Sequence, residues 1–246
     1  QGSPAGGGGK VSGGFAEAIV YGADSGAAVS SNSWGYTQKG VYDPAVLEAI
    51  DYAVSSGTAV VFAAGNFGDV NEASEFEESE AWFPAAHPGA VAVAAVDWRG
   101  RAAAFTNRGP WVDIAAPGVS VLSTVATSEG KYGELSGTSM ATPLVAAALG
   151  LARSLSRNAT MRELLACLEL TASSLDAANP HLPQGPKMAG LGAGLLDVWG
   201  LVLCGAGPRL APTASPTTTQ APTAVATAAP SPAPSVGCSA ECSLAA

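Results

Sequence analysis

One serine of this chain lies in a sequence context that favours nucleophilic chemistry. Residues 137–143 read Gly-Thr-Ser-Met-Ala-Thr-Pro, and an apolar run follows from Leu144 to Ala152. Glycine permits a sharp turn before the serine, and the unpaired N–H groups of a helix start favour a developing oxyanion. We expect a helix buried on all sides, with Pro143 in its first turn, where a missing N–H costs little. This pattern makes Ser139 a candidate nucleophile.

A serine nucleophile needs a base, usually a histidine that a carboxylate orients. The chain has two histidines, His87 and His181. Each lies between prolines, in a segment typical of surface loops. Neither stands at a glycine-rich helix start, so we expect both to be exposed loop residues and not the base for Ser139.

Several segments resemble motifs of the subtilisin-like serine peptidases, the subtilases, in the branch of subtilisin and proteinase K. Residues 137–143 are similar to the family's nucleophile motif. Residues 61–66 resemble the strand that ends in its oxyanion-hole asparagine, and residues 31–35 resemble the strand end that lines its primary specificity pocket. Further similar segments follow in the family's order at 83–97, 104–107 and 112–118.

The resemblance covers about residues 15–203 and implies a serine endopeptidase that acts on polypeptides through an acyl-enzyme on Ser139. It implies that the side-chain amide of Asn66 donates to the oxyanion. The family's substrate pocket pairs its backbone with an extended peptide. Its walls are implied here at Ser33, Trp34, Gly35, Ala64 and Gly65.

The chain departs from the family where the aspartate and histidine motifs belong, which is before the serine and before the helix expected at Phe15. That space holds a glycine-rich segment, and the first residue is not methionine. We therefore expect the C-terminal part of a peptidase that lacks two triad members and is inactive alone. Two alternatives stay open: an inactive pseudo-peptidase that binds peptides, and a secreted structural protein.

The alternation of apolar patterns predicts an α/β fold, a doubly wound parallel sheet with helices on both faces. Continuous apolar runs indicate parallel strands at 27–33, 58–63 and 90–96. Capping residues indicate helices from Asp43-Pro44 to Gly57 and from the capping box of Thr160 and Glu163 to about 170. The other expected elements are a helix at 15–23, a hairpin within 118–135 and a short strand or helix at 191–203.

Two polar residues, Ser33 and Asn66, directly follow expected strands. The carboxyl ends of parallel strands lie at one edge of a sheet, where α/β proteins place their sites. We therefore expect Ser33 and Asn66 to lie close together, next to the start of the Ser139 helix.

Composition divides the chain into four segments. Residues 1–14 are a disordered glycine-rich segment, 15–207 a partial catalytic domain, 208–236 a linker rich in Pro, Thr, Ala and Ser, and 237–246 a short tail with cysteines. The net charge of −9 argues against nucleic acid and anionic membranes as partners. We expect a monomer without a membrane-spanning segment.

The linker, the Asn158-Ala159-Thr160 sequon and the even number of cysteines favour a secretory route for a glycoprotein. Cys167 and Cys204 lie in segments that could pack together and pair. The spacing of Cys238 and Cys242 fits a metal site, a tight disulfide or the start of a clipped cysteine-rich module.

No cofactor is expected for the chemistry, but a structural metal is one interpretation of three residues. Resemblance to proteinase K implies a calcium ion on the carbonyl groups of Pro88 and Ala90 and the side chain of Asp113. Oxygen ligands suit this cation, although waters must complete the shell. The alternative is that Asp113 caps a turn.

The loop after Asn66 is acidic, and in the family it closes the bottom of the specificity pocket. One hypothesis is that basic residues are favoured on the acyl side of the cut, and the alternative is a solvated acidic loop. The residues concerned are Glu72, Glu75, Glu77, Glu78 and Glu80.

Overall fold

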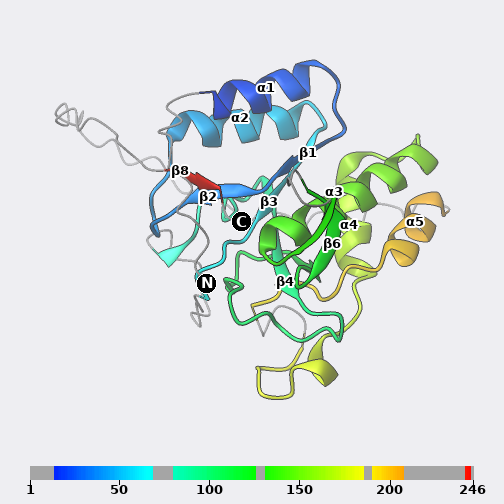
Figure 1. The fold of residues 1–246 in the computed structure, drawn as a ribbon. Coiled ribbons are helices and arrows are strands. Elements are labelled where there is room, and N and C mark those ends of the chain that lie inside the picture. Colours follow the sequence, from blue (N-terminus) through cyan, green and yellow to red (C-terminus); the bar gives the residue numbers. More distant parts are fainter. Residues whose placement is uncertain (1–13, 69–79, 126–130, 186–189, 208–241, 245–246) are drawn as a thin grey trace, which may run out of the picture.

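A four-stranded parallel sheet forms the centre of the protein in the computed structural model, which describes residues 14–68, 80–125, 131–185, 190–207 and 242–244. The strand order is β1-β3-β4-β5, and each neighbouring pair is parallel (Figure 1). The strands are β1 (Val29–Asn32), β3 (Ala59–Ala63), β4 (Ala90–Val96) and β5 (Ile114–Pro117).

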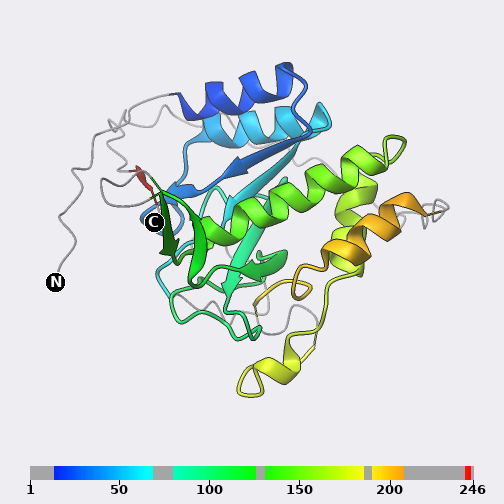
Figure 2. The same ribbon diagram turned by 45° about the vertical axis from the view of Figure 1, so that its right-hand side comes forward.

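Helices cover both faces of this sheet, and alternate side chains of the strands separate two apolar cores. Val60 and Phe62 face the core of α1 (Phe15–Asp24) and α2 (Pro44–Ser55). Val61 and Val93 face the core shared with α3 (Thr138–Leu155), α4 (Met161–Leu170) and α5 (Val198–Ala206). The two helical layers lie on opposite sides of the sheet in Figures 1 and 2, so the predicted doubly wound α/β fold is confirmed.

The predicted helix caps are present in the structure. The carboxylate of Asp43 accepts a hydrogen bond from the Ala45 N–H at 2.9 Å, and Gly57 has φ of 88° just past the end of α2. At α4, Thr160 Oγ1 accepts from the Glu163 N–H at 3.2 Å, and the Glu163 carboxylate accepts from the Thr160 N–H at 2.7 Å. These bonds satisfy N–H groups that a helix start leaves unpaired.

The strand expected at 27–33 is instead two short strands. Only β1 joins the main sheet, and it is less buried than β3 and β4. The next strand, β2 (Trp34–Tyr36), leaves the main sheet and pairs antiparallel with β8 (Cys242–Leu244). The strand β5 was not predicted, because four residues are too few to show a period.

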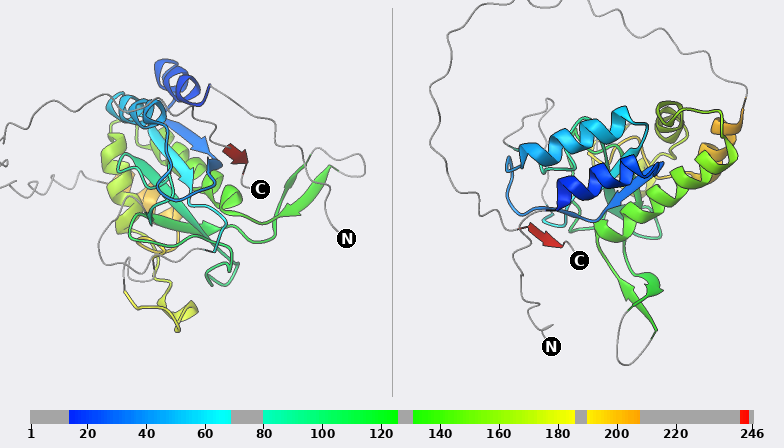
Figure 3. Two further views of the ribbon diagram at one scale, coloured as in Figure 1. Left: turned by 90° about the vertical axis from the view of Figure 1, so that its left-hand side faces the viewer. Right: turned by 90° about the horizontal axis from the view of Figure 1, so that it is seen from above.

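The remaining connections agree with the sequence in outline. The expected hairpin is β6 (Val121–Thr124) and β7 (Tyr132–Leu135), which projects from the body of the molecule (Figure 3). A disulfide bond joins Cys167 of α4 to Cys204 of α5, as the sequence suggested. None of the helices in the described part of the chain is long and apolar enough to cross a membrane.

Two expectations for the Ser139 helix are wrong. The helix α3 begins at Thr138, so Pro143 lies in its second turn and not in its first. The helix is also buried on one face only: Val145 and Leu149 are fully buried against the sheet, whereas Leu151 is 47% exposed. Apolar composition on all sides therefore did not predict burial, because no described segment covers the outer face of α3.

Candidate active site

Ser139 is the second residue of α3 and lies at the carboxyl ends of the parallel strands. Its side chain is nearly buried, since the residue is 6% exposed. The residue before the helix, Gly137, has extended backbone and donates its N–H to the Gly118 carbonyl at 2.8 Å. Gly118 in turn donates to the Val96 carbonyl at 2.9 Å. These bonds fix the start of α3 to the end of β4.

The amide of Asn66 contacts the start of α3 directly. Its Oδ1 accepts from the Thr138 N–H and from the Thr138 hydroxyl, both at 2.8 Å. Because the amide oxygen is engaged, the amide nitrogen is the free end of the group. A Cβ atom placed on Gly137 would lie 3.2 Å from Asn66 Nδ2 and 3.6 Å from the Ser139 nitrogen. The two nitrogen atoms, together with Met140 Sδ at 3.6 Å, therefore border one small space in front of the helix, and a side chain at position 137 would fill it.

Ser33 supplies a bond that the proline of α3 removes. In a regular helix the N–H of residue 143 would donate to the carbonyl of residue 139, but Pro143 has no N–H. The Ser33 hydroxyl donates to the Ser139 carbonyl instead, at 2.9 Å. Ser33 and Asn66 thus meet at the start of α3, as their positions after β1 and β3 predicted.

This exchange of donors predicts coupling between positions 33 and 143. We expect Ser33→Ala to lower the free energy of unfolding by about 1–2 kcal/mol, because it removes the hydrogen bond that the Ser33 hydroxyl donates to the Ser139 carbonyl. Pro143→Ala provides an N–H for the same carbonyl, so Ser33→Ala should cost at least about 1 kcal/mol less in that background. Denaturant unfolding of the wild type, both single variants and the double variant measures the coupling. Equal costs in the two backgrounds would disprove this role for Ser33.

Asn107 holds the loop that carries Asn66, a role that sequence reasoning missed. Its side chain is fully buried, donates from Nδ2 to the Ala64 carbonyl and accepts at Oδ1 from the Phe67 N–H, both at 3.0 Å. Its backbone N–H donates to the Gly65 carbonyl at 3.0 Å. The one available signal was an asparagine next to an apolar stretch, which does not reveal a partner some 40 residues away.

The residues expected to line the specificity pocket have side chains that are buried, small or absent. Trp34 is a core residue, and its ring lies 4.2 Å from the tilted Phe15 ring and 5.2 Å, edge to face, from the Phe62 ring between centroids. Ala64 is also buried, whereas Gly35 and Gly65 are partly exposed. Next to Asn66, the exposed Phe67 ring stacks on the buried Trp82 ring at 4.2 Å between centroids, a contact that the sequence did not predict.

Most of the acidic loop lies outside the described residues. Glu72, Glu75, Glu77 and Glu78 belong to that part, so the preference for basic residues stays a prediction. The member that is described, Glu80, forms an ion pair with Lys39 at 2.9 Å.

One of the two histidine expectations is wrong. His181 is exposed, as expected, but the His87 side chain is only 12% exposed and lies 3.6 Å from the Asp51 carboxylate. His87 precedes β4 and so lies at the amino end of the sheet, about 20 Å along the strand from the end that faces Ser139. The prolines beside His87 indicated a turn correctly but carried no information on its burial.

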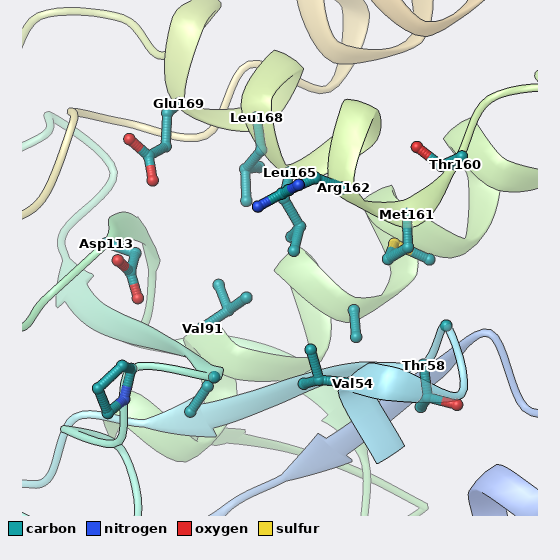
Figure 4. A pocket seen from close by; sticks show the side chains of 15 residues that line it. Val54, Thr58, Val91, Asp113, Thr160, Met161, Arg162, Leu165, Leu168 and Glu169 are labelled. Carbon is teal, nitrogen blue, oxygen red and sulfur yellow. The ribbon is translucent and has the colours of Figure 1, made fainter. Parts of the chain in front are cut away.

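The three residues expected to hold calcium line one cavity. Pro88, Ala90 and Asp113 border a space of about 400 Å³ between the sheet and α4, which contributes Arg162 and Glu169 (Figure 4). Asp113 Oδ2 accepts from the Ala92 N–H at 2.8 Å. Among the described residues, no group of three or more His, Cys, Asp or Glu side chains could hold a metal ion. A calcium ion here would therefore depend on backbone carbonyl oxygens and water in addition to the Asp113 carboxylate.

Comparison with known proteins identifies the class of protein that this fold and site define. A sequence profile of the Subtilase family, Peptidase_S8, matches residues 1–191. The chain belongs to the subtilase family. The match begins nearer the start of the chain than the resemblance from residue 15 suggested, and it ends before α5.

Individual relatives agree with this assignment. The chain is 38% identical over 171 residues to the Thermophilic serine proteinase of Bacillus sp. (strain AK1), covering 70% of this chain and 39% of the relative. It is 39% identical over 170 residues to Thermitase of Thermoactinomyces vulgaris, covering 69% of this chain and 55% of the relative. The chain thus spans about two fifths to one half of these curated relatives.

Solved structures agree as well. Fervidolysin from Fervidobacterium pennivorans, described as a keratinolytic enzyme related to subtilisin, is 30% identical with a TM-score of 0.60, covering 78% of this chain and 28% of that one. The Prenylagaramide maturation protease PagA is 25% identical with a TM-score of 0.65, and the match covers 78% of this chain and 66% of that one.

Proposed function

We propose that this chain is the nucleophile-bearing part of a serine endopeptidase that cleaves polypeptides. Ser139 Oγ attacks the carbonyl carbon of the scissile peptide bond while a histidine accepts its proton. The Asn66 amide and the Ser139 N–H donate to the oxygen as it becomes negative. The departing amine takes the proton from the histidine, and water then hydrolyses the acyl-enzyme.

The observation that carries this proposal is the convergence of the two donors. Asn66 Nδ2 and the Ser139 nitrogen lie around one point next to Gly137. Donors fixed in advance around the place where charge develops are the largest single contribution in many acyl-transfer enzymes. The likeness to named serine proteinases supports the same reaction.

We propose that the histidine and its aspartate come from polypeptide outside this sequence. His87 lies at the wrong end of the sheet, and His181 is exposed in a loop. Two features support an additional partner segment: β1 is the last strand on its side of the described sheet, and α3, which packs beside it, exposes Leu144, Leu151 and Leu155. Contiguous exposed apolar side chains commonly mark a contact surface.

A labelling experiment tests the proposed function. We define the extended form as this chain together with the polypeptide encoded upstream of Gln1. A fluorophosphonate should modify Ser139 rapidly in the extended form and should fail to modify its Ser139→Ala variant. The chain as printed should react at least about 10³-fold more slowly, because the histidine that we propose as the base of Ser139 lies outside this sequence. An extended form that contains a histidine and an aspartate motif yet stays unlabelled would favour the inactive, peptide-binding alternative.

We propose a structural calcium ion, with Asp113 and the carbonyls of Pro88 and Ala90 as ligands. The three residues share one cavity, and all offer the oxygen donors that calcium prefers. Binding to the folded state alone would stabilise it by mass action. Substrate preference for basic residues, a monomeric state and the absence of nucleic-acid or membrane partners remain predictions.

Calcium removal provides a test that does not need activity. We expect excess chelator to lower the Tm by several degrees, corresponding to about 2–3 kcal/mol at saturating metal. Asp113→Asn retains an oxygen acceptor for the Ala92 N–H but loses the charge, so its Tm should be nearly insensitive to the chelator. An unchanged Tm of the wild type in chelator would remove the calcium proposal.

We also propose a secretory route. The Cys167–Cys204 disulfide supports it, since such bonds persist in oxidising compartments. Asn158, the sequon asparagine, is exposed between α3 and α4. One relative, from Paenibacillus polymyxa, is named Intracellular serine protease, so the compartment has to be tested on this protein by fractionation of its source cells.

A further inference from the structure

The edge of β2 is occupied by another segment of the same chain. Residues Cys242–Leu244 form β8 and pair antiparallel with β2, with Ser243 opposite Gly35 and Leu244 opposite Trp34. The two strands form a separate two-stranded sheet, and β8 lies beside β2 in the views of Figures 1 and 3. This β2 segment carries the residues implied to bind an extended peptide substrate.

Backbone geometry identifies the side of β2 that a peptide can use. The Tyr36 N–H donates to the Phe83 carbonyl at 3.1 Å, so one side of β2 is engaged by the segment before β4. Successive residues of a strand direct their N–H and C=O groups to opposite sides. Gly35 therefore directs its backbone groups away from Phe83, to the side that is open to an added strand.

The direction of β8 relates it to the nucleophile. Because the pairing is antiparallel, β8 runs from beside Tyr36 toward Trp34, the neighbour of Ser33. The Ser33 hydroxyl donates to the Ser139 carbonyl at 2.9 Å. The strand β8 thus approaches Ser139 in its N-to-C direction. The acyl part of a peptide substrate must run in the same direction, because the carbonyl that the serine attacks lies at its C-terminal end.

We propose that the segment Cys242–Leu244 is a ligand in cis for the acyl-side peptide edge of β2 and competes there with polypeptide substrates. This inference rests on the proposed function, because it takes β2 as the substrate edge. Adding a strand to a sheet edge is a general mode of peptide recognition in which the main chain supplies the affinity. The pairing also covers an edge that would otherwise be free to associate with other chains.

The connection between α5 and β8 permits this contact. About 35 residues separate the two elements, and a chain of that length can reach at most about 115 Å. A tethered segment has an effective concentration on the order of 1 mM near its site. If the free segment binds with a Kd of about 100 μM, the tether reduces the apparent affinity of a competing peptide about tenfold.

Peptide binding to variants of the whole printed chain, residues 1–246, tests the proposal. All proteins carry Ser139→Ala, so that no probe is consumed. The probe is a fluorescein-labelled peptide with the sequence of residues 239–246 and serine in place of the cysteine, measured by fluorescence anisotropy. Ser243→Pro removes the N–H opposite Gly35, and it should bind the probe about tenfold more tightly than the parent. Ser243→Ala keeps the backbone bond and should stay within twofold of the parent, as should Thr223→Pro in the linker.

Amide exchange provides a second measurement on the same proteins. Ser243→Pro should raise hydrogen exchange at Gly35, whereas Ser243→Ala should not. Far-UV circular dichroism and thermal melting establish that each variant is folded. A chain that ends at residue 241 should behave as Ser243→Pro does. Equal probe affinity in the parent, the proline variant and the shortened chain would overturn the proposal.

The result is distinguishable from a failure of the proposed function. Probe binding and amide exchange do not depend on acylation of Ser139. An extended form that does not react with fluorophosphonate, while Ser243→Pro still gains affinity, would refute the peptidase and leave the cis ligand in place. An active extended form whose KM is the same with and without Ser243→Pro would refute the cis ligand alone.

Discussion

Asn66→Ala should reduce kcat of the extended form on the order of 10²–10³-fold, the magnitude known for loss of such a donor in a subtilisin, with little change in KM. The amide nitrogen of Asn66 borders the same space as the Ser139 N–H. Charge reaches that space only as the carbonyl carbon becomes tetrahedral, so the interaction is stronger in the transition state than in the substrate complex. Steady-state kinetics on a chromogenic peptide separate kcat from KM.

A matched variant separates this chemical effect from loss of structure. Asn66 Oδ1 also accepts two hydrogen bonds from Thr138, which alanine would remove. Asn66→Asp keeps an oxygen acceptor for both bonds but has no N–H to donate. It should therefore be folded like the wild type and yet lose at least as much kcat as Asn66→Ala. Near-normal kcat in Asn66→Asp would assign the asparagine a structural role only.

The sequence predicted those parts of the fold whose signals are local. The helix α2 is marked by an aspartate cap, a proline at its first position and a glycine after its end, and all three act as expected. The strand β4 was predicted with its observed bounds, because a strand covered on both faces is apolar throughout. The meeting of Ser33 and Asn66 followed from the same reasoning, since both lie just past the carboxyl ends of parallel strands.

The features that were missed depend on partners distant in sequence. A continuous apolar run indicates burial only if some segment covers every face, and α3 is covered on one face in the described structure. Proline suits the first turn of a helix, but α3 starts early enough to place Pro143 in the second turn. A hydroxyl more than 100 residues away in sequence replaces the lost donor. The pairing of β8 with β2 has no local signal, because three residues of ordinary composition do not show which edge they join.

Gly65→Ala should be among the most damaging single-methyl changes near the site, with a loss of about 3–5 kcal/mol in the free energy of unfolding. Gly65 has φ of 104°, and a Cβ atom there would lie within 2.4 Å of Asn107 Nδ2. That nitrogen cannot move without breaking buried hydrogen bonds that hold the loop of Asn66. We therefore expect kcat of the extended form to fall as well, because the loop positions the donor.

Gly57→Ala is the matched control, since it separates backbone strain from the clash with Asn107. Gly57 has φ of 88° and lies just before β3, as Gly65 lies just after it, but a Cβ atom at Gly57 would meet nothing within 4 Å. Strain at positive φ alone should cost about 1–2 kcal/mol and leave kcat unchanged. Urea unfolding and peptide kinetics on both variants give the comparison. Equal losses of unfolding free energy and of kcat in the two variants would mean that the Asn107 side chain can move at little cost. The Asn66 loop would then not depend on Asn107 for its position.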